Sequence, residues 1–118
     1  MTTRATIERY YEALRNKSEW DSFFADDVVF TSFTSPTRQI SDRGAFVEGT
    51  KRFYAMIISF EVRELIIDGE KACGLTRYVL QAPNAGPRFS SDVAEIFVVK
   101  AGKIASFAIY FDTAPYPK

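Results

Sequence analysis

The order in which strand and helix patterns follow one another constrains the fold of this chain most. After residue 57, four strand-like segments occur in succession, at residues 58–67, 71–81, 89–99 and 104–112. Each is rich in β-branched and aromatic residues and is followed by a turn or loop signal, such as Asp68-Gly69 or Ala101-Gly102. Successive strands joined by such turns pair antiparallel. The second half of the chain therefore predicts a sheet built from consecutive hairpins.

The first half of the chain carries helical patterns. Residues 3–16 place four apolar residues at the spacing i, i+3, i+4 and i+7, and these are Ile7, Tyr10, Tyr11 and Leu14. This spacing predicts an amphipathic helix with one buried face. A second, short helix is expected over residues 19–24, because Ser18 can cap it and Asp21 suits its first turn.

One strand and a third helix are expected before the hairpins. Residues 28–34 predict a strand that ends at Ser35-Pro36. Ser41 or Asp42 can cap a third helix that runs to about residue 57. Helices first and hairpin strands afterwards predict an α+β domain, with the helices on one face of a mainly antiparallel sheet. A length of 118 residues suits a single domain over residues 1–118.

Aromatic residues are more numerous than an ordinary core of this size requires. They make up 15% of the chain, with eleven Phe and six Tyr. We interpret this excess as the lining of an apolar pocket or as an apolar contact surface between subunits. A small hydrophobic molecule and a homodimer are therefore the expected partners.

Charge and hydropathy argue against two other partners. Fifteen basic and fifteen acidic residues cancel, and neither sign forms a block, so nucleic-acid binding is not expected. The longest apolar runs, such as residues 54–58, are far shorter than the ~20 residues of a membrane-spanning helix. The first residues also lack the apolar region of a signal peptide. A cytoplasmic protein without membrane association is expected.

The absence of histidine limits the chemistry that is possible. A Ser-His-Asp or Cys-His arrangement cannot be built, and Cys73 alone does not supply the usual zinc ligands. We interpret Cys73 as a small buried hydrophobe in a strand. Proton transfer would use Asp, Glu, Tyr, Lys, water or the substrate, and neither a metal nor a cofactor is expected.

Several motifs in a fixed order resemble a known superfamily. They are the Arg-Tyr-Tyr-Glu-Ala-Leu segment at residues 9–14, Trp20, residues 23–27, Phe53-Tyr54 and residues 102–112. Together they are similar to the nuclear-transport-factor-2-like (NTF2-like) superfamily, in its SnoaL-like polyketide cyclase and ketosteroid-isomerase-like branch. The resemblance implies a cone-shaped α+β barrel of the cystatin-like type, in which three N-terminal helices pack in the concave face of a strongly curved sheet. It also implies a homodimer through the outer face of that sheet.

The resemblance implies roles for individual residues. Tyr10 occupies the position of the isomerase tyrosine that donates a hydrogen bond to the substrate oxygen, and Glu95 falls close to the acid that stays protonated beside it. The isomerase's proton-carrying aspartate corresponds to Ser32, and an unassisted serine does not accept a proton at neutral pH. The catalytic aspartate of the related epoxide hydrolase corresponds to Ile109. Steroid isomerase and epoxide hydrolase activities are therefore not expected.

Strand alternation leaves two orientations open for residue 95. With a period of two, Glu95 shares a face with apolar residues such as Val93 and Phe97, and burial there would raise its pKa and make it a general acid near neutral pH. In the opposite register, or after a bulge, Asp92 would face inward instead. Arg77 and Tyr78 present the same ambiguity on the preceding strand, and an inward Arg77 would favour an anionic group on the ligand.

Three further carboxylates are candidate catalytic groups. Asp112 ends the last strand, where polyketide-cyclase-like relatives use an acid as a base, but its expected outward position favours a turn role. Asp26 and Asp27 form a carboxylate pair, and their place between a helix and a strand favours a role at helix ends and turns.

Two functions are compatible with these patterns. The first is a cofactor-independent isomerase, cyclase or dehydratase of a small apolar carbonyl compound, with Tyr10 and Glu95 polarising the carbonyl oxygen. The second is a non-catalytic ligand-binding protein or dimeric scaffold of the same fold. In both, the pocket is expected to be lined by Trp20, Phe24, Phe30, Ser32, Phe53, Tyr54, Arg77, Phe97 and Ile109.

Overall fold

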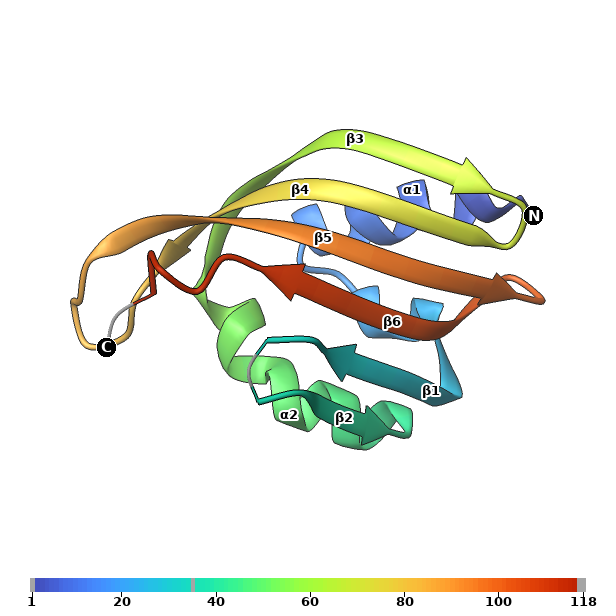
Figure 1. The fold of residues 1–118 in the computed structure, drawn as a ribbon, viewed down its shortest axis with the longest axis horizontal. Coiled ribbons are helices and arrows are strands. Elements are labelled where there is room, and N and C mark those ends of the chain that lie inside the picture. Colours follow the sequence, from blue (N-terminus) through green and yellow to red (C-terminus); the bar gives the residue numbers. More distant parts are fainter. Residues whose placement is uncertain (1, 35, 117–118) are drawn as a thin grey trace.

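The computed structural model describes residues 2–34 and 36–116 and places six strands in one sheet. The strands are β1 (Phe24–Ser32), β2 (Arg38–Ser41), β3 (Ile57–Asp68), β4 (Lys71–Gln81), β5 (Arg88–Lys100) and β6 (Lys103–Phe111). Their order across the sheet is β2-β1-β6-β5-β4-β3, and every neighbouring pair is antiparallel except β1 and β6, which run parallel (Figure 1). The four predicted hairpin strands are confirmed, and each end lies within one residue of its predicted position.

Two α-helices are present in the described residues, where three helices were expected. They are α1 (Thr3–Arg15) and α2 (Arg43–Met56). The second expected helix is a single 3-10 turn, η1 (Trp20–Phe23), and Ser18 does not cap it, because its N-cap position is Glu19 with no side-chain hydrogen bond. The chain cannot extend this turn into a helix, since Phe24 is already paired in β1 and wholly buried.

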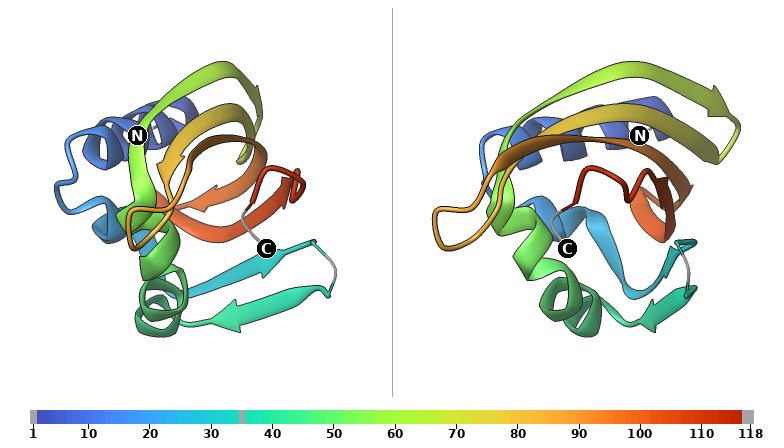
Figure 2. Two further views of the ribbon diagram at one scale, coloured as in Figure 1. Left: turned by 90° about the vertical axis from the view of Figure 1, so that its left-hand side faces the viewer. Right: turned by 60° about the vertical axis from the view of Figure 1, so that its left-hand side comes forward.

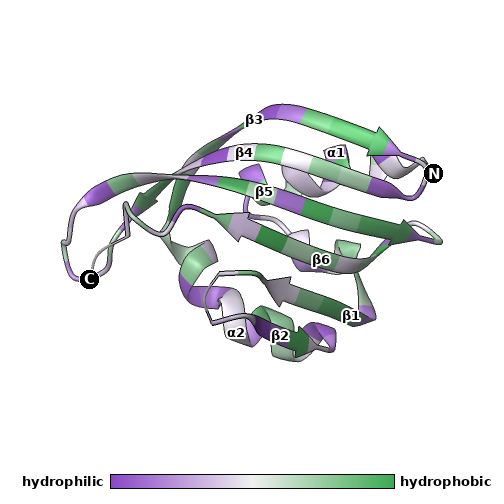
Figure 3. Cartoon of the chain, in the orientation of Figure 1, coloured by the Kyte–Doolittle hydropathy of each residue, from purple (hydrophilic) through white to green (hydrophobic). Residues whose placement is uncertain are grey.

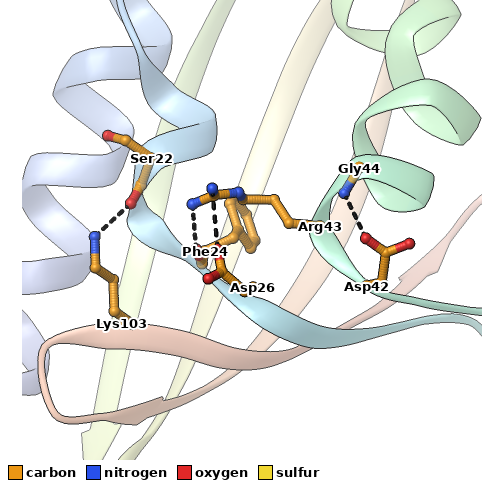
Figure 4. A network of polar contacts seen from close by, with 7 residues as sticks. All are labelled: Ser22, Phe24, Asp26, Asp42, Arg43, Gly44 and Lys103. Carbon is orange, nitrogen blue, oxygen red and sulfur yellow. Dashed lines mark hydrogen bonds and ion pairs between the residues drawn. The ribbon is translucent and has the colours of Figure 1, made fainter.

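The ends of the two helices follow from their sequences. Thr2 caps α1 by accepting a hydrogen bond of 3.0 Å from the Ala5 backbone N–H. Asp42 caps α2 through the Gly44 N–H at 3.0 Å, which confirms one of the two predicted caps (Figure 4). The predicted inner stripe of α1 is buried, since Ile7, Tyr10, Tyr11 and Leu14 all lie in the core.

Strand β1 starts four residues before the predicted strand at residues 28–34, and strand β2 was not predicted. The pairing of β1 with β6 shifts register between Phe24 and Val29, so Asp26 and Asp27 lie at an irregular point of the strand and not in a turn. Asp26 forms an ion pair of 3.0 Å with Arg43, which ties this point of β1 to the start of α2 (Figure 4). Of the expected turn at Ser35-Pro36, Ser35 lies outside the described residues.

The sheet is open and not strongly curled, so the expected cone-shaped barrel is corrected. Both helices lie on one face of the sheet, with α1 packed against β3 and β4 and α2 against β1 and β2 (Figure 2). Edge strands β2 and β3 stay apart, since the helices cover the inner face in place of strand closure. Neither helix in the described part of the chain has the length and apolar character needed to span a membrane.

One hydrophobic core fills the space between helices and sheet. Long apolar stretches mark β5, β6 and β1 (Figure 3), and the inward side chains of these strands meet those of α1 and α2. On β5, Val93, Phe97 and Val99 face inward, whereas Asp92 and Ile96 face outward. This alternation fixes the face on which residue 95 lies.

Candidate functional site

A cavity of about 400 Å³ lies between α2 and the inner face of the sheet. The apolar part of its wall consists of Phe30, Phe53, Met56, Val93, Phe107, Ile109 and Phe111. Its polar part includes the hydroxyl groups of Ser32, Thr34, Tyr54 and Tyr78 and the carboxyl group of Glu95. The cavity exists because α2 contacts β1 and β2 while α1 contacts β3 and β4, which leaves the middle strands partly uncovered.

Five of the nine predicted pocket residues line this cavity. They are Phe30, Ser32, Phe53, Tyr54 and Ile109. Phe24 and Phe97 are fully buried in the core and do not reach the cavity. Trp20 stacks on Tyr54 with 4.0 Å between ring centroids and lines a separate, smaller cavity of about 220 Å³.

Arg77 lies on the outer face, so its predicted place in the pocket is wrong. Its Nε atom lies 3.8 Å from an Asp92 carboxylate oxygen, and both side chains are largely exposed. Tyr78, the next residue, points inward and is 1% exposed. Strand alternation requires that these two neighbours point to opposite faces, and the structure shows that Tyr78 is the inward one.

Glu95 is the buried acid of the cavity, and it takes the inward one of the two orientations that strand alternation leaves open. It is 3% exposed. Oε1 accepts hydrogen bonds from the Tyr11 hydroxyl at 2.8 Å and the Thr76 hydroxyl at 2.7 Å, and Oε2 accepts one from the Tyr78 hydroxyl at 2.7 Å. The three donors come from α1 and β4, so the acid on β5 is held from two sides of the core.

Burial raises the pKa of Glu95 above its ordinary value. Hydrogen bonds from Thr76, Tyr78 and Tyr11 act in the opposite direction, because they stabilise the charged form. No basic side chain is among its hydrogen-bond partners in the described residues, so the burial effect prevails. The carboxyl group is thus suited to hold a proton at higher pH than an exposed glutamate does.

Tyr10 lies in the core and not in the cavity wall. It is 0% exposed, and its hydroxyl lies 3.1 Å from the hydroxyl of Tyr54, which does line the cavity. Burial, with the proximity of Tyr54, raises the pKa of Tyr10, so its hydroxyl stays protonated. Tyr10 therefore contacts a cavity ligand only through Tyr54.

Tyr11 and Thr76 are site residues that the sequence patterns did not single out, and Tyr78 is the inward one of the pair that strand alternation left open. Tyr11 reaches Glu95 because it passes over Gly74, the residue that pairs with Glu95 across β4 and β5. A Cβ atom at Gly74 would collide with the Tyr11 hydroxyl. A glycine in the interior of a strand was the one local signal of this close approach.

Asp112 belongs to a turn on the outer side of the sheet. Its carboxylate accepts a hydrogen bond of 3.0 Å from the Ala114 N–H, and the residue is exposed. The weak prediction of a catalytic role for Asp112 is therefore not supported by its position, whereas the turn role fits. Cys73 is only partly buried, not fully as expected.

The cavity offers one acid and several hydroxyl groups. Among the lining residues that the structure describes, Glu95 is the only carboxylate. Ser32 Oγ lies 3.0 Å from Thr34 Oγ1, a second hydroxyl that cannot activate it as a base. In residues 2–34 and 36–116, no cluster of three or more acidic or cysteine side chains is arranged to hold a metal ion. Polarisation of a ligand oxygen is the chemistry this arrangement supports.

Comparisons with known proteins agree with this architecture. A family model described as a SnoaL-like domain matches residues 7–107. No curated protein matches the sequence. The chain is similar to the solved structure of an NTF2-like protein from Burkholderia thailandensis, with 22% identity, a TM-score of 0.82 and coverage of 96% of this chain and 92% of that chain.

Two further solved structures share the fold. One is a proposed SnoaL-like polyketide cyclase from Mesorhizobium loti, with 18% identity, a TM-score of 0.71 and coverage of 93% of this chain and 99% of that chain. The other is a hypothetical protein with a ketosteroid isomerase-like fold from Catenulispora acidiphila, in complex with trimethylamine, with 16% identity, a TM-score of 0.77 and coverage of 93% and 87%. At these identities the likeness concerns the fold.

Proposed function

Because this chain belongs to the family of SnoaL-like domains, we propose that it binds a small, mainly apolar molecule in the cavity beside Glu95. The single observation that carries this proposal is the pairing of an apolar chamber with one buried, hydroxyl-bound acid in its wall. An oxygen atom of the ligand lies at the Glu95 and Tyr78 end, and its apolar body lies against Phe53, Phe107 and Ile109.

The size and lining of the cavity support this assignment. Its volume of about 400 Å³ falls in the range of ~300–1,000 Å³ typical of small-molecule sites. Such sites are mainly apolar and contain a few polar groups that fix the orientation of the ligand. Here Glu95, Tyr54 and Tyr78 are those polar groups.

A second candidate function is cofactor-independent isomerisation, cyclisation or dehydration of a bound carbonyl compound. The observation that favours it is the raised pKa of Glu95 in the cavity wall. A protonated carboxyl group donates a hydrogen bond to a carbonyl oxygen and stabilises the enolate that forms when a neighbouring C–H loses its proton. The base in this scheme is water or a group of the substrate, because Ser32 is not one.

The alternative within the same fold is a non-catalytic ligand-binding protein or a dimeric scaffold. All three hydroxyl groups around Glu95 already donate to it, which also suits a purely structural cluster. The outer sheet face carries exposed Ile96 and Tyr110, and Phe33 stacks on Tyr110 with 4.7 Å between ring centroids. We propose this face as the contact surface of a homodimer.

Ligand binding is tested first, by native mass spectrometry and calorimetry with a panel of bicyclic and polyketide-like ketones such as 1-tetralone. Binding to the wild type and weaker binding to a cavity-filling Ile109→Trp variant are expected. Absence of binding across the panel contradicts the proposal.

Turnover of the same ketones tests the catalytic candidate. Turnover that is lost in Glu95→Gln but kept in Glu61→Gln, an exposed control on β3, supports an enzymatic function. Turnover that is equal in both variants contradicts an acid role for Glu95.

A further inference from the structure

Two arginines lie where the cavity meets solvent. Most residues that line the cavity are buried or half-buried, and the exposed ones are Pro36, Arg38, Gly49 and Arg52. These exposed residues mark the end of the cavity that opens to solvent, whereas the buried Glu95 marks its closed end. Arg38 comes from β2 and Arg52 from α2, so two separate elements each contribute one guanidinium to the opening.

The Arg38 side chain of β2 reaches α2 at Gly49, one helical turn before Arg52. An Nη atom of Arg38 lies 3.7 Å from the position that a Cβ atom of Gly49 would take. Arg52 is three residues further along α2, one helical turn from Gly49 and on the same face. Gly49 carries no side chain, which lets the side chains of β2 approach α2 closely, with Ile40 Cδ1 only 2.7 Å from that same Cβ position.

No carboxylate in residues 2–34 and 36–116 is paired with Arg38 or Arg52. Among the described residues, Arg15, Arg43 and Arg77 each lie within 4.0 Å of a carboxylate oxygen, whereas Arg38 and Arg52 have none at that distance. Two cations that line one opening repel one another, and an anion placed between them relieves that repulsion. Guanidinium groups also match the planar, two-oxygen geometry of a carboxylate.

We infer that the ligand of this cavity is an organic anion whose apolar body fills the chamber and whose single carboxylate or sulfonate group lies at the opening between Arg38 and Arg52. The inference rests on the proposed function and adds the chemical class of the ligand. The anionic group occupies the open end, where it remains partly hydrated. The apolar body extends inward toward Glu95, whose burial raises its pKa and so favours the uncharged form.

A matched pair of fluorescent probes tests this inference. 8-Anilinonaphthalene-1-sulfonate carries one sulfonate, and N-phenyl-1-naphthylamine has the same aromatic framework without it. Both are titrated into the wild type, Arg38→Gln, Arg52→Gln and the double variant. Arg9→Gln is the control, because Arg9 is exposed on α1 and does not line the cavity. Circular dichroism verifies that each variant is folded, and Ile109→Trp verifies that the probes occupy the cavity.

We expect the double variant to lose about tenfold in affinity for the sulfonate and less than about twofold for the neutral probe. Salt at 1 M should weaken only the sulfonate. Equal loss of both probes, no loss of the sulfonate, or sulfonate binding that Ile109→Trp leaves intact would overturn the inference. If neither probe binds the wild type, the proposed function fails together with it; if only the neutral probe binds, the inference fails alone.

Discussion

The Tyr78 hydroxyl donates a hydrogen bond of 2.7 Å to Oε2 of Glu95, and both residues line the cavity. The Tyr78 hydroxyl thus holds the Glu95 carboxyl group in place, and it also lies beside that group in the cavity wall. The Tyr11 and Thr76 hydroxyls occupy the other carboxyl oxygen. In the proposed binding mode, a ligand oxygen meets Glu95 and Tyr78 together, in an orientation that the core has already set.

Truncation of the acid is expected to destabilise the fold. Glu95→Ala leaves three buried hydroxyl groups without their acceptor, and we expect a loss of about 2–4 kcal/mol in the free energy of unfolding. Tyr78→Phe removes one donor and should cost about 1 kcal/mol. Urea denaturation measures both values. A loss below about 0.5 kcal/mol in Glu95→Ala, equal to that of exposed Glu61→Ala, would show that the cluster does not stabilise the protein.

The stability of the protein should depend on pH through Glu95. Burial raises the folded-state pKa of Glu95 above its ordinary value of 4.5, so between the two values the folded protein binds more protons than the unfolded chain. The stabilisation is full below pH 4.5 and is lost as the pH rises through the folded-state pKa. Relative to Glu95→Gln, which does not titrate, the wild type should lose stability over this range. If the wild type instead gains stability relative to Glu95→Gln as the pH rises, the pKa of Glu95 is lowered in the folded protein and the account is contradicted.

Gly74 should be intolerant of a side chain because of Tyr11. In Gly74→Ala the new methyl group collides with the Tyr11 hydroxyl, and we expect a loss of about 1–3 kcal/mol. Tyr11→Phe removes the colliding oxygen, so the double variant should be more stable than the sum of the single losses predicts. A double-mutant cycle by chemical denaturation measures this coupling. Strict additivity would mean that the two residues do not touch.

The proposed dimer contact predicts a change of mass on one substitution. Tyr110 is 50% exposed on the outer face, and Tyr110→Glu places a charge in the proposed apolar contact. We expect sedimentation at micromolar concentration to shift from dimer to monomer. Arg9→Glu, a charge change on exposed α1, should leave the mass unchanged. A wild type that sediments as a monomer contradicts the proposal.

Local sequence patterns predicted the helices and strands that bury one face and expose the other. The stripe of α1 and the alternation of β5 each lie in consecutive residues, so both patterns could be predicted from the sequence, although the sequence left open which face of β5 points inward. Strand β2 was not readable, because the four residues from Arg38 to Ser41 are mostly polar and exposed. The 3-10 turn η1 is likewise too short to leave a periodic pattern.

The polar cluster was only half predictable, because its contacts join distant parts of the chain. Tyr10 and Tyr11 are adjacent on α1, and a rotation of about 100° between neighbours decides which hydroxyl reaches the acid. The resemblance favoured Tyr10 beside Glu95, whereas the structure places Tyr11 there and Tyr10 against Tyr54. Helix periodicity fixes the face but not this choice, which depends on the open space above Gly74.

The carbonyl ¹³C chemical shift of a labelled ketone bound in the cavity tests the central claim most directly. If 1-tetralone labelled at its carbonyl carbon binds with its oxygen at Glu95 and Tyr78, hydrogen bonding should move the bound signal downfield of its position in an apolar solvent. That displacement should shrink in Tyr78→Phe and in Glu95→Gln and persist in Glu61→Gln. A bound signal at the same position in all four proteins would contradict the account.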